Sequence, residues 1–547
     1  MPEILAVEVP VHQKVKWNLE DQLIPLTIGL IGHRKLAEQE INGIVAEFDD
    51  FLARLLGPLK HTPILLLTSL AEGADRIALR SKFRDSLTIC AVLPFKLESY
   101  RKDFQGPRAL LDFEESLKTV DLIIEPFTSD AKSTERNLAY RKCANWISER
   151  SNILVAIWNG KFNEEPGGTS DTIAYRTTKN ERIGFSESLN TDVFHIIGSN
   201  GNEGVKKDCD CIFHKSSQKA AFPDLKLIES FNEAISIEIL KKDSRDISLN
   251  IFDSMASAAK KKYLRASRII LILGLVALNL LNITQISNSR ICFFATLSTF
   301  SLTFIVWHRS LRLNLKAKYE SFRMIAEVLR IQSWWTQIGI EIRLIDHHRT
   351  NIESDNEIRK VADNLIATRE IQSLLGFQGE KRSLEVDEIH QTAKLWLTEQ
   401  MEYLGGDSNK IGAIRANGNS ARRFDLLSKV FVGVTLILFI LTQQLELEAS
   451  DFSANIFFMF YTMLIPICLS ISAGSIAYIQ LMGFKEIAAR FESSFRVIQR
   501  SLLQLKVLKK NTDKKNILSI VEEVGVESYC ESIYWYKISK SRDLRPL

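Results

Sequence analysis

The sequence predicts a protein of two parts, an α/β domain with a parallel β-sheet followed by an all-α membrane module with four transmembrane helices in two hairpins. Three observations lead to this prediction. Short β-branched runs alternate with helical patterns up to residue 197, as in parallel sheets covered by helices. Long apolar runs lie beyond residue 268, and Lys and Arg side chains gather beside those runs.

The α/β prediction starts at residues 26–31, an apolar run rich in β-branched residues that is followed by helical spacing of apolar residues over 38–56. The same alternation then recurs along the chain. It predicts a helix that continues from the loop at residues 69–76 to Phe83, and further strands over residues 64–67, 87–94, 122–124, 153–158 and 193–197.

The first predicted membrane hairpin covers residues 269–307. Residues 269–281 and 291–307 contain no charged side chain, and a polar turn over residues 282–290 separates them. With its flanking residues, each run is about long enough to cross a hydrocarbon core of roughly 30 Å as a helix. A buried core helix is the alternative for the first run, because the chain becomes polar after Leu281.

A second hairpin of the same kind is predicted over residues 426–445 and 455–482, and residues 457–479 within it are uncharged. A soluble domain rarely uses four such segments for its core. The four segments together therefore favour membrane spans over buried helices.

Basic residues stand at one side of both hairpins. They precede the first and third spans and follow the second and fourth. Of the two short connecting turns, the first has Arg290 as its charged residue, and the charged residues of the second are acidic. The basic residues are Lys260, Lys261, Lys262, Arg265, Arg309, Arg312, Lys316, Lys318, Arg422, Arg423, Lys485 and Arg490. The positive-inside rule then predicts a protein integral to the cytoplasmic (inner) membrane with both termini in the cytoplasm. The net charge is +4, and much of the basic surplus lies beside the predicted spans, where the membrane accounts for it. No nucleic-acid partner is therefore expected.

Chemically informative residues follow the predicted strands. Ligands of parallel α/β folds bind beyond the carboxyl ends of the strands, where glycines allow close backbone approach and amides or arginines attract anions. A structural alternative remains, in which Gly73 and Gly167 permit tight turns and Glu72 and Asp75 cap a helix. The candidate ligand-binding residues are Gly32, His33, Arg34, Ser69, Glu72, Gly73, Asp75, Arg76, Pro94, Gly167, Gly168 and Thr169.

These motifs resemble the SLOG superfamily, the Rossmann-like group that joins the DNA-processing protein A fold to the Lonely Guy-like nucleotide hydrolases. The resemblance covers about residues 25–199 and rests on residues 32–34, 69–76, 91–94 and 167–169, with Tyr100, Asp103, Phe104 and Asp171. It implies binding of a nucleotide or a nucleotide-derived signal. Hydrolases of this group have a longer glycine-rich loop and a catalytic glutamate, whereas this sequence has a shorter loop with Asp171 as the nearest carboxylate.

The second half resembles the SLATT class of membrane modules. Each hairpin is followed by a long helical pattern, over residues 313–332 and 486–508, which suggests an internal repeat. Trp334, Trp335, Trp396 and Trp535 also contribute to the resemblance. It implies a pore-forming or membrane-disrupting effector that responds to a nucleotide signal in bacterial anti-phage defence, and we expect the lipid bilayer and further copies of the same chain as partners.

Small and weakly polar residues interrupt the predicted spans. The spans hold no ionisable residue near their centres, and Lys429 lies near an end, so the ion-coupling pairs of a transporter are missing. The small residues either pack helices closely or line a narrow pore in an oligomer. They are Ser298, Thr299, Ser301, Thr303, Ser470, Ser472, Gly474 and Ser475.

Three functions follow from these patterns. The first is a sensor-effector whose N-terminal domain binds a nucleotide-derived ligand and gates the membrane module. The second is a membrane-tethered hydrolase that cleaves a nucleotide N-glycosidic bond or degrades a signal, with Asp171 or Glu72 as the catalytic candidate. The third is a scaffold that recruits a partner through its α/β domain.

No metal site or resident cofactor is expected. Cys209 and Cys211, with His195 and His214 nearby, do not match the spacing of an ordinary zinc site. The predicted organisation is an N-terminal extension (1–24), the α/β domain (25–222), linker helices (223–268), the first hairpin (269–307), a cytoplasmic helical segment (308–425), the second hairpin (426–482) and C-terminal helices (483–547).

Overall fold

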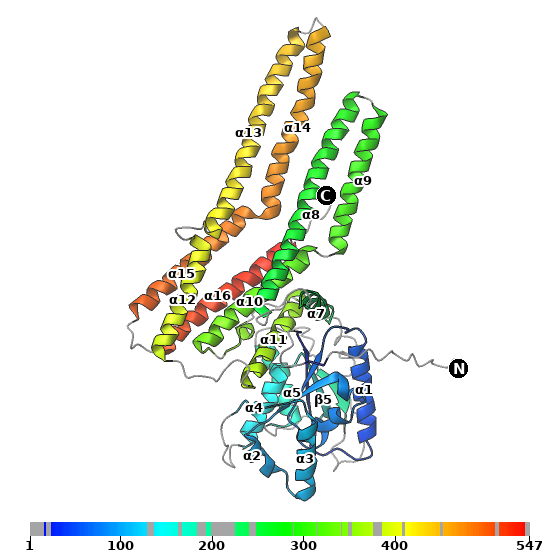
Figure 1. The fold of residues 1–547 in the computed structure, drawn as a ribbon, viewed down its shortest axis with the longest axis vertical. Coiled ribbons are helices and arrows are strands. Elements are labelled where there is room, and N and C mark those ends of the chain that lie inside the picture. Colours follow the sequence, from blue (N-terminus) through cyan, green and yellow to red (C-terminus); the bar gives the residue numbers. More distant parts are fainter. Residues whose placement is uncertain are drawn as a thin grey trace, which may run out of the picture. The chain divides into compact units, whose positions relative to one another are not determined.

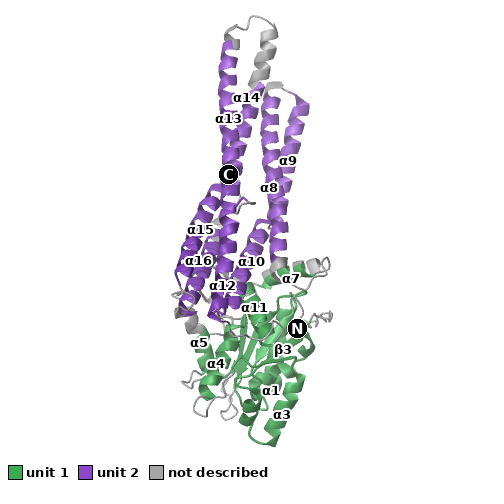
Figure 2. Cartoon of the chain, turned by 60° about the vertical axis from the view of Figure 1, so that its left-hand side comes forward, with its two compact units in different colours: residues 1–251, 345–382 green, residues 252–344, 383–547 purple. Residues whose placement is uncertain are grey.

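The chain forms two compact units, shown in separate colours in Figure 2, and the first unit is discontinuous in sequence. Residues 1–251 and 345–382 make the first unit, and residues 252–344 and 383–547 make the second. The structure is a computed structural model. It describes residues 16–17, 23–127, 136–161, 167–182, 193–198, 225–239, 248–287, 289–313, 315–340, 342–347, 353–375, 385–406, 411–448, 452–508 and 514–541.

A parallel sheet of six strands forms the centre of the first unit, in the order β4-β3-β2-β1-β5-β6, which confirms the predicted α/β class (Figure 1). All the predicted strands are present within a few residues of their expected bounds. They are β1 (Leu26–Gly32), β2 (Ile64–Thr68), β3 (Leu87–Val92), β4 (Leu122–Ile124), β5 (Ile153–Trp158) and β6 (Val193–Ile197). The inner strands are nearly continuous apolar runs because both faces of a parallel sheet are buried.

Strand β1 marks the point where the strand order reverses. From β1 the chain builds β2, β3 and β4 on one side, and later adds β5 and β6 on the other side. Ile28 of β1 lies opposite Leu66 of β2 and Ile153 of β5. A ligand of an open α/β sheet binds at such a switch point, beyond the carboxyl ends of the strands.

Helices cover both faces of the sheet. Helix α1 (Ile41–Leu56) packs on one face, where Phe51 meets Phe194 of β6 with ring centroids 4.5 Å apart. On the other face, Trp146 and Ile147 of α4 (Arg136–Glu149) and Ile173 of α5 (Thr169–Arg182) join a core with β-strand residues. Helices α2 (Leu97–Tyr100) and α3 (Pro107–Thr119) follow β3.

The helix expected from the loop at residues 69–76 to Phe83 is replaced by the 3₁₀ turn η1 (Gly73–Arg80). Two more 3₁₀ turns are η2 (Arg84–Ser86) and η3 (Arg101–Asp103). Local hydrogen bonds explain the difference. Thr68 Oγ1 donates to the Asp75 carbonyl at 2.8 Å, and Ala74 N donates to the His33 carbonyl at 3.0 Å. These bonds tie the segment to β1 and β2 and replace part of the α-helical ladder.

Two helices attach at the amino ends of the strands, opposite the candidate ligand edge. The predicted helix α7 (Leu225–Ile239) is present, and Asn232 Nδ2 donates to the Ile24 carbonyl at 2.9 Å just before β1. Helix α11 (Glu353–Leu374) comes from the segment expected to be a separate cytoplasmic region. Thr27 Oγ1 of β1 donates to Asn364 Oδ1 of α11 at 2.8 Å, so α11 is a core element of the first unit.

The second unit is helical and includes four helices long and apolar enough to cross a membrane, as the sequence predicts. The four are Phe252–Gln285, Arg290–Ile338, Ala413–Gln444 and Met463–Val507, which begin in α8, α9, α13 and α14. The helices of this part are α8 (Ser248–Ser287), α9 (Arg290–Arg312), α10 (Leu315–Ile338), α12 (Val386–Gly405), α13 (Ala413–Glu448), α14 (Phe452–Met482), α15 (Phe484–Val507) and α16 (Lys514–Ser541). The 3₁₀ turn η5 (Leu344–His347) lies where the chain returns to the first unit.

The first hairpin turn is shorter than the expected residues 282–290, because α8 continues to Ser287 and α9 begins at Arg290. Polar side chains bond back to their own helix and therefore do not end it. Asn279 Nδ2 donates to the Leu275 carbonyl and Thr284 Oγ1 donates to the Leu280 carbonyl, both at 2.7 Å.

The small residues of α14 pack helices together. Ser472 Oγ is 2.8 Å from Ser428 Oγ of α13, and a Cβ on Gly474 would lie 2.6 Å from Leu275 Cδ1 of α8. On α9, by contrast, Ser298 and Ser301 are exposed. Ser472 and Gly474 of α14 thus pack helices closely, whereas Ser298 and Ser301 of α9 are exposed in a single chain.

The helices that follow the hairpins pack around tryptophans. Trp335 of α10 is fully buried, and Trp334 stacks on Trp396 of α12 with ring centroids 6.5 Å apart. Both tryptophans of α10 therefore lie in packed helix contacts. Gly525 of α16 lies against Trp335, where a Cβ would be 2.6 Å from Trp335 Cε2. Helices α10 and α16 therefore approach closely at this glycine.

Replacing Gly525 with Ala should destabilise the second unit by about 1–3 kcal/mol, because the added methyl group would overlap a buried indole ring. Thermal unfolding of the full-length protein in lipid nanodiscs measures the effect. Gly418→Ala on α13 is the matched control, since no atom lies within 4 Å of its Cβ position. Equal melting temperatures for the two variants would contradict the packing assignment.

Candidate functional site

Three loops meet at the carboxyl ends of β1, β2 and β5. His33 N donates to the Ile157 carbonyl at 3.0 Å, and the His33 carbonyl accepts from Ala74 N at 3.0 Å. Asn159 N donates to His33 Nε2 at 3.1 Å, so this ring nitrogen serves as an acceptor. The structure thus brings the motif at Gly32, His33 and Arg34 beside the loop of residues 69–76.

Glycines allow the backbones of these loops to touch. Gly73 has a φ of +80°, and a Cβ there would lie 2.5 Å from the His33 carbonyl oxygen. A Cβ on Gly32 would lie 3.0 Å from Ile157 Cβ and closer still to Ala74. Both positions require glycine, because any side chain would push the strand-end loops apart.

A buried carboxylate sits under the loop after β2. Asp75 is 6% exposed, and its carboxylate accepts a hydrogen bond from Ser69 Oγ. Burial raises the pKa of Asp75 from 3.8 to about 6, and the Ser69 bond and the Arg34 charge only partly oppose this shift. A group that titrates this close to neutrality can change charge when a ligand alters its surroundings.

The loop that holds this carboxylate has an unusual backbone. Leu70 is fully buried with a φ of +55°, and it is the non-glycine residue with positive φ among those the structure describes. Its carbonyl accepts from Arg76 Nε at 3.1 Å, and the neighbouring Ser69 carbonyl accepts from the Tyr100 hydroxyl at 3.2 Å. Backbone in this region is costly and persists where neighbours hold it, as at many ligand sites.

Two arginines from the predicted set lie over aromatic rings. The Arg34 guanidinium is 4.6 Å from the Tyr140 ring centroid, and the Arg76 guanidinium is 5.4 Å from that of Phe104. Burial lowers the pKa of Arg76, although Tyr100 and Glu72 oppose the shift. Arg76 Nη2 is buried and has no hydrogen-bond partner among the described residues. The N–H groups on Nη2 are therefore available to an anion.

Helix α4 adds residues that sequence reasoning missed. The Tyr140 hydroxyl and Arg136 Nη2 both donate to the Asp103 carboxylate, and the Arg136 guanidinium is 4.2 Å from the Phe95 ring centroid. Asp103 entered the sequence analysis only through the family resemblance. The spacing of Arg136 and Tyr140 by four residues on a helix is the one sequence signal that could have shown their shared face.

The loop of Gly167 and Gly168, just before α5, is held by contacts with α4 and α5. Asp171 accepts from Gly167 N at 2.9 Å and pairs with Arg141, whose Nε is 2.8 Å from Asp171 Oδ2. The Gly168 carbonyl accepts from Thr172 N at 3.2 Å, and Thr169 is the first residue of α5. Gly167 has a φ of +83°, with its Cβ position 2.9 Å from the Asn137 carbonyl oxygen, so the loop lies on α4.

The remaining predicted residues contribute less. Pro94 is buried after β3 and offers no donor. Glu72 precedes η1, but its side chain does not cap that turn. Among the described residues, neither Glu72 nor Asp171 is bonded to a His, Ser or Cys side chain that could complete a catalytic group. Cys209, Cys211 and His214 lie outside the described residues.

Comparison with known proteins leaves the family open. Neither a scan against models of protein families nor a search of curated proteins finds a match to this chain. Function is therefore inferred from the strand-end site and the candidate membrane spans.

The Asp75→Asn variant should be more stable than the original protein at pH 8, and equally stable near pH 4. Between pH 3.8 and about 6 the folded state binds more protons than the unfolded state, so the free energy of unfolding falls as pH rises through this window. The shift corresponds to as much as about 3 kcal/mol, which Asn avoids because it carries no charge.

Thermal unfolding of both full-length proteins at pH 4 and pH 8 measures this difference. The Asp50→Asn variant, which removes an exposed carboxylate from α1, is the control and should show no such pH-dependent gap. A gap of the same size at both pH values would mean that Asp75 is not held with a raised pKa.

Proposed function

We propose that the first unit binds an anionic, nucleotide-derived signal at the carboxyl ends of β1, β2 and β5, and that binding gates the membrane helices of the second unit. The observation that carries this proposal is the buried Arg76 Nη2, which has no partner among the described residues and lies at the predicted ligand edge. Charge-assisted bonds from arginine are a principal way of holding phosphate.

Aromatic side chains support a nucleotide rather than a small inorganic anion. Tyr140, whose ring lies beside Arg34, is partly exposed and could stack on a base. Tyr100 and Phe104, which lie next to Arg76, are buried and shape the wall of the site instead. Aromatic rings stack on bases while arginines hold phosphates. The position at the β1/β5 switch point agrees with this ligand class.

The candidate spans support an effector in the membrane. Apolar side chains on these helices are exposed, as for Ile291 at 81%, and lipid would cover them in a bilayer. Lys429 pairs with Asp425 at 2.7 Å on the same helix, so it does not offer an ion-coupling site. Exposed Ser298 and Ser301 on α9 provide a weakly polar face that could line a pore between copies of the chain.

The proposed setting is the cytoplasmic membrane, with both termini cytoplasmic, and the proposed assembly is a homo-oligomer. The resemblance to SLOG and SLATT modules adds bacterial anti-phage defence as the expected context. A ligand can shift the membrane helices only through different affinities for the closed and open states. The strand-end site must therefore differ between those states.

The hydrolase alternative has weaker support. Both carboxylate oxygens of Asp171 are engaged by Arg141 and by Gly167 N, and Arg141 would have to release Asp171 before it could act as a base. Such a carboxylate suits the start of α5 better than proton transfer.

Replacing Arg34 and Arg76 together with Ala should abolish ligand-triggered leakage from liposomes that contain the protein. A charge-assisted hydrogen bond contributes about 1.5–3 kcal/mol, so each arginine should account for roughly 10- to 100-fold in affinity. Dye release is measured against a panel of cyclic and linear nucleotides.

The matched control is the Arg54→Ala and Arg108→Ala double variant, which removes two exposed arginines from α1 and α3. It should respond to the same nucleotide at a similar concentration. Consumption of a nucleotide without any dye release would reject the gated effector and favour the hydrolase.

Replacing Asp171 with Asn distinguishes the gated effector from the hydrolase. We expect nucleotide-triggered release to stay within about threefold of the original, because the amide keeps an acceptor for Gly167 N. A hydrolase that uses Asp171 as its base would lose about 100-fold or more in turnover. Chromatography of the nucleotide after incubation reports turnover, and loss of hydrolysis in this variant alone would identify Asp171 as catalytic.

A further inference from the structure

Helix α11 connects the two units through the chain itself. In sequence, residues 345–382 lie between the first and second hairpins, yet they belong to the first unit. From Val361 onward the helix is largely buried, and it shares a core with Trp146 through Ile371. Its buried apolar residues are Val361, Ala362, Leu365, Ile366, Ala367 and Ile371.

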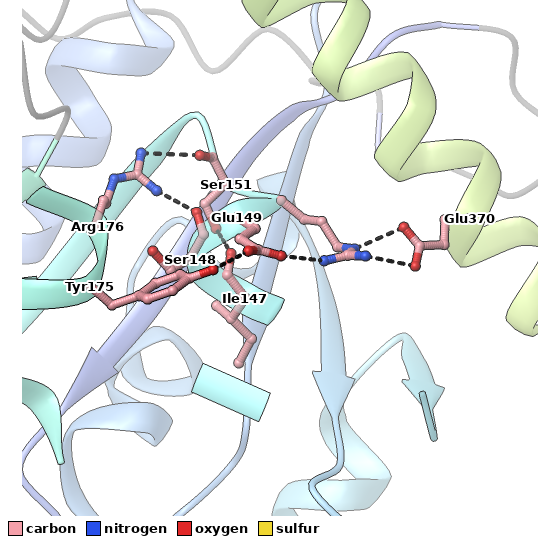
Figure 3. A network of polar contacts seen from close by, with 8 residues as sticks. Ile147, Ser148, Glu149, Ser151, Tyr175, Arg176 and Glu370 are labelled. Carbon is pink, nitrogen blue, oxygen red and sulfur yellow. Dashed lines mark hydrogen bonds and ion pairs between the residues drawn. The ribbon is translucent and has the colours of Figure 1, made fainter. Parts of the chain in front are cut away.

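An ion pair fastens α11 to the end of α4 (Figure 3). Arg150 donates to Glu370 through Nε and Nη2, both at 2.8 Å, and its guanidinium is 4.2 Å from the Trp146 ring centroid. The Arg150 side chain is 10% exposed and that of Glu370 is 33% exposed. An ion pair with two hydrogen bonds and one well-buried partner has a defined geometry, so it opposes movement of α11 relative to α4.

The opposite end of α4 lies at the candidate site. Arg136 and Tyr140 bind Asp103 there, and Arg34 rests on the Tyr140 ring. Helix α4 has 14 residues, so about 21 Å separates its ends. Because hydrogen bonds link successive turns of the helix, a displacement at one end is expected to be passed to the other.

Helix α5 is bound to α4 at both ends. Arg141 pairs with Asp171 near the site, and Tyr175 donates to Glu149 near α11. Arg176 Nη2 also donates to the Ser151 carbonyl at 3.1 Å (Figure 3). It donates to the Asn152 carbonyl at the same distance. These contacts make α4 and α5 a paired element that contacts the candidate site at one end and α11 at the other.

We infer that α4 conveys a change at the strand-end site to α11 through the Arg150–Glu370 pair, so that the site regulates the segment between the two hairpins. The inference rests on the proposed function for its ligand. An anion that draws Arg34 away from Tyr140 acts on the second turn of α4, and displacement of the helix acts on Glu370 at its far end. Arg150 and Glu370 are positioning residues in this scheme.

The test is a double-mutant cycle in the full-length protein in nanodiscs, without any ligand. Tyr140→Phe removes the hydroxyl bond to Asp103 at the site, and Glu370→Gln weakens the distant ion pair. Hydrogen exchange of residues 361–371 is the readout. We expect Tyr140→Phe to change their exchange about 5-fold or more, and this change to disappear in the Glu370→Gln background.

Two further variants test the geometry of the ion pair and provide a control. Arg150→Lys retains the charge but loses the two-bond geometry, and should reduce the effect of Tyr140→Phe without removing it. Asp50→Asn removes an exposed ion pair on α1 and should leave that effect unchanged. A merely structural role for Glu370 would change α11 exchange by itself, but would not change its response to Tyr140→Phe.

The cycle also separates this inference from the proposed function. Additive effects of Tyr140→Phe and Glu370→Gln on exchange would overturn the α4 route, even if a nucleotide triggers dye release. Coupled effects with no release by any nucleotide of the panel would support the route and reject the gating proposal.

Discussion

Close packing around strand β1 is the constraint on which the first unit depends. A Cβ on Gly29 would lie 2.9 Å from Leu154 Cδ1, so the central strand leaves no space for a side chain at this position. The amino end of β1 holds α11 through Thr27 and Asn364, and its carboxyl end holds the β2 loop through His33 and Ala74. The candidate site and the returning helix are therefore attached to opposite ends of one buried strand.

Charge burial distinguishes the carboxyl end of the sheet from the rest of this core. Asp75 is buried with a raised pKa, and Arg76 keeps a buried nitrogen without a hydrogen-bond partner among the described residues. Both features cost folding free energy, and Leu70 adds an unfavourable backbone conformation. Proteins retain such costs chiefly where function requires them, which favours a binding site over a purely structural turn.

The second unit combines two kinds of packing. In the candidate spans, small residues bring backbones together, as Gly474 does against Leu275, while large apolar side chains remain exposed. The helices beyond the spans pack around tryptophans and charged residues. Arg490 donates to Glu531 at 2.5 Å and lies 5.7 Å from the Trp535 ring centroid, so α15 and α16 are held by a polar and aromatic contact. Lipid and water are thus expected to solvate different lengths of the same long helices.

By itself the sequence determined the strands and the membrane-length helices, because continuous apolar runs and charge-free stretches are local signals. It also identified Arg34, Asp75 and Arg76, since strand-end loops of a parallel sheet meet at one edge. Only the tertiary structure added Arg136 and Tyr140 to that edge and assigned α11 to the first unit. Thr27 and Asn364 are 337 positions apart in the chain, and no local periodicity encodes a contact across such a distance. The sequence of α14 likewise left open whether its small residues pack helices or line a pore. The contacts with α8 and α13, which are distant in the chain, show that Ser472 and Gly474 pack helices.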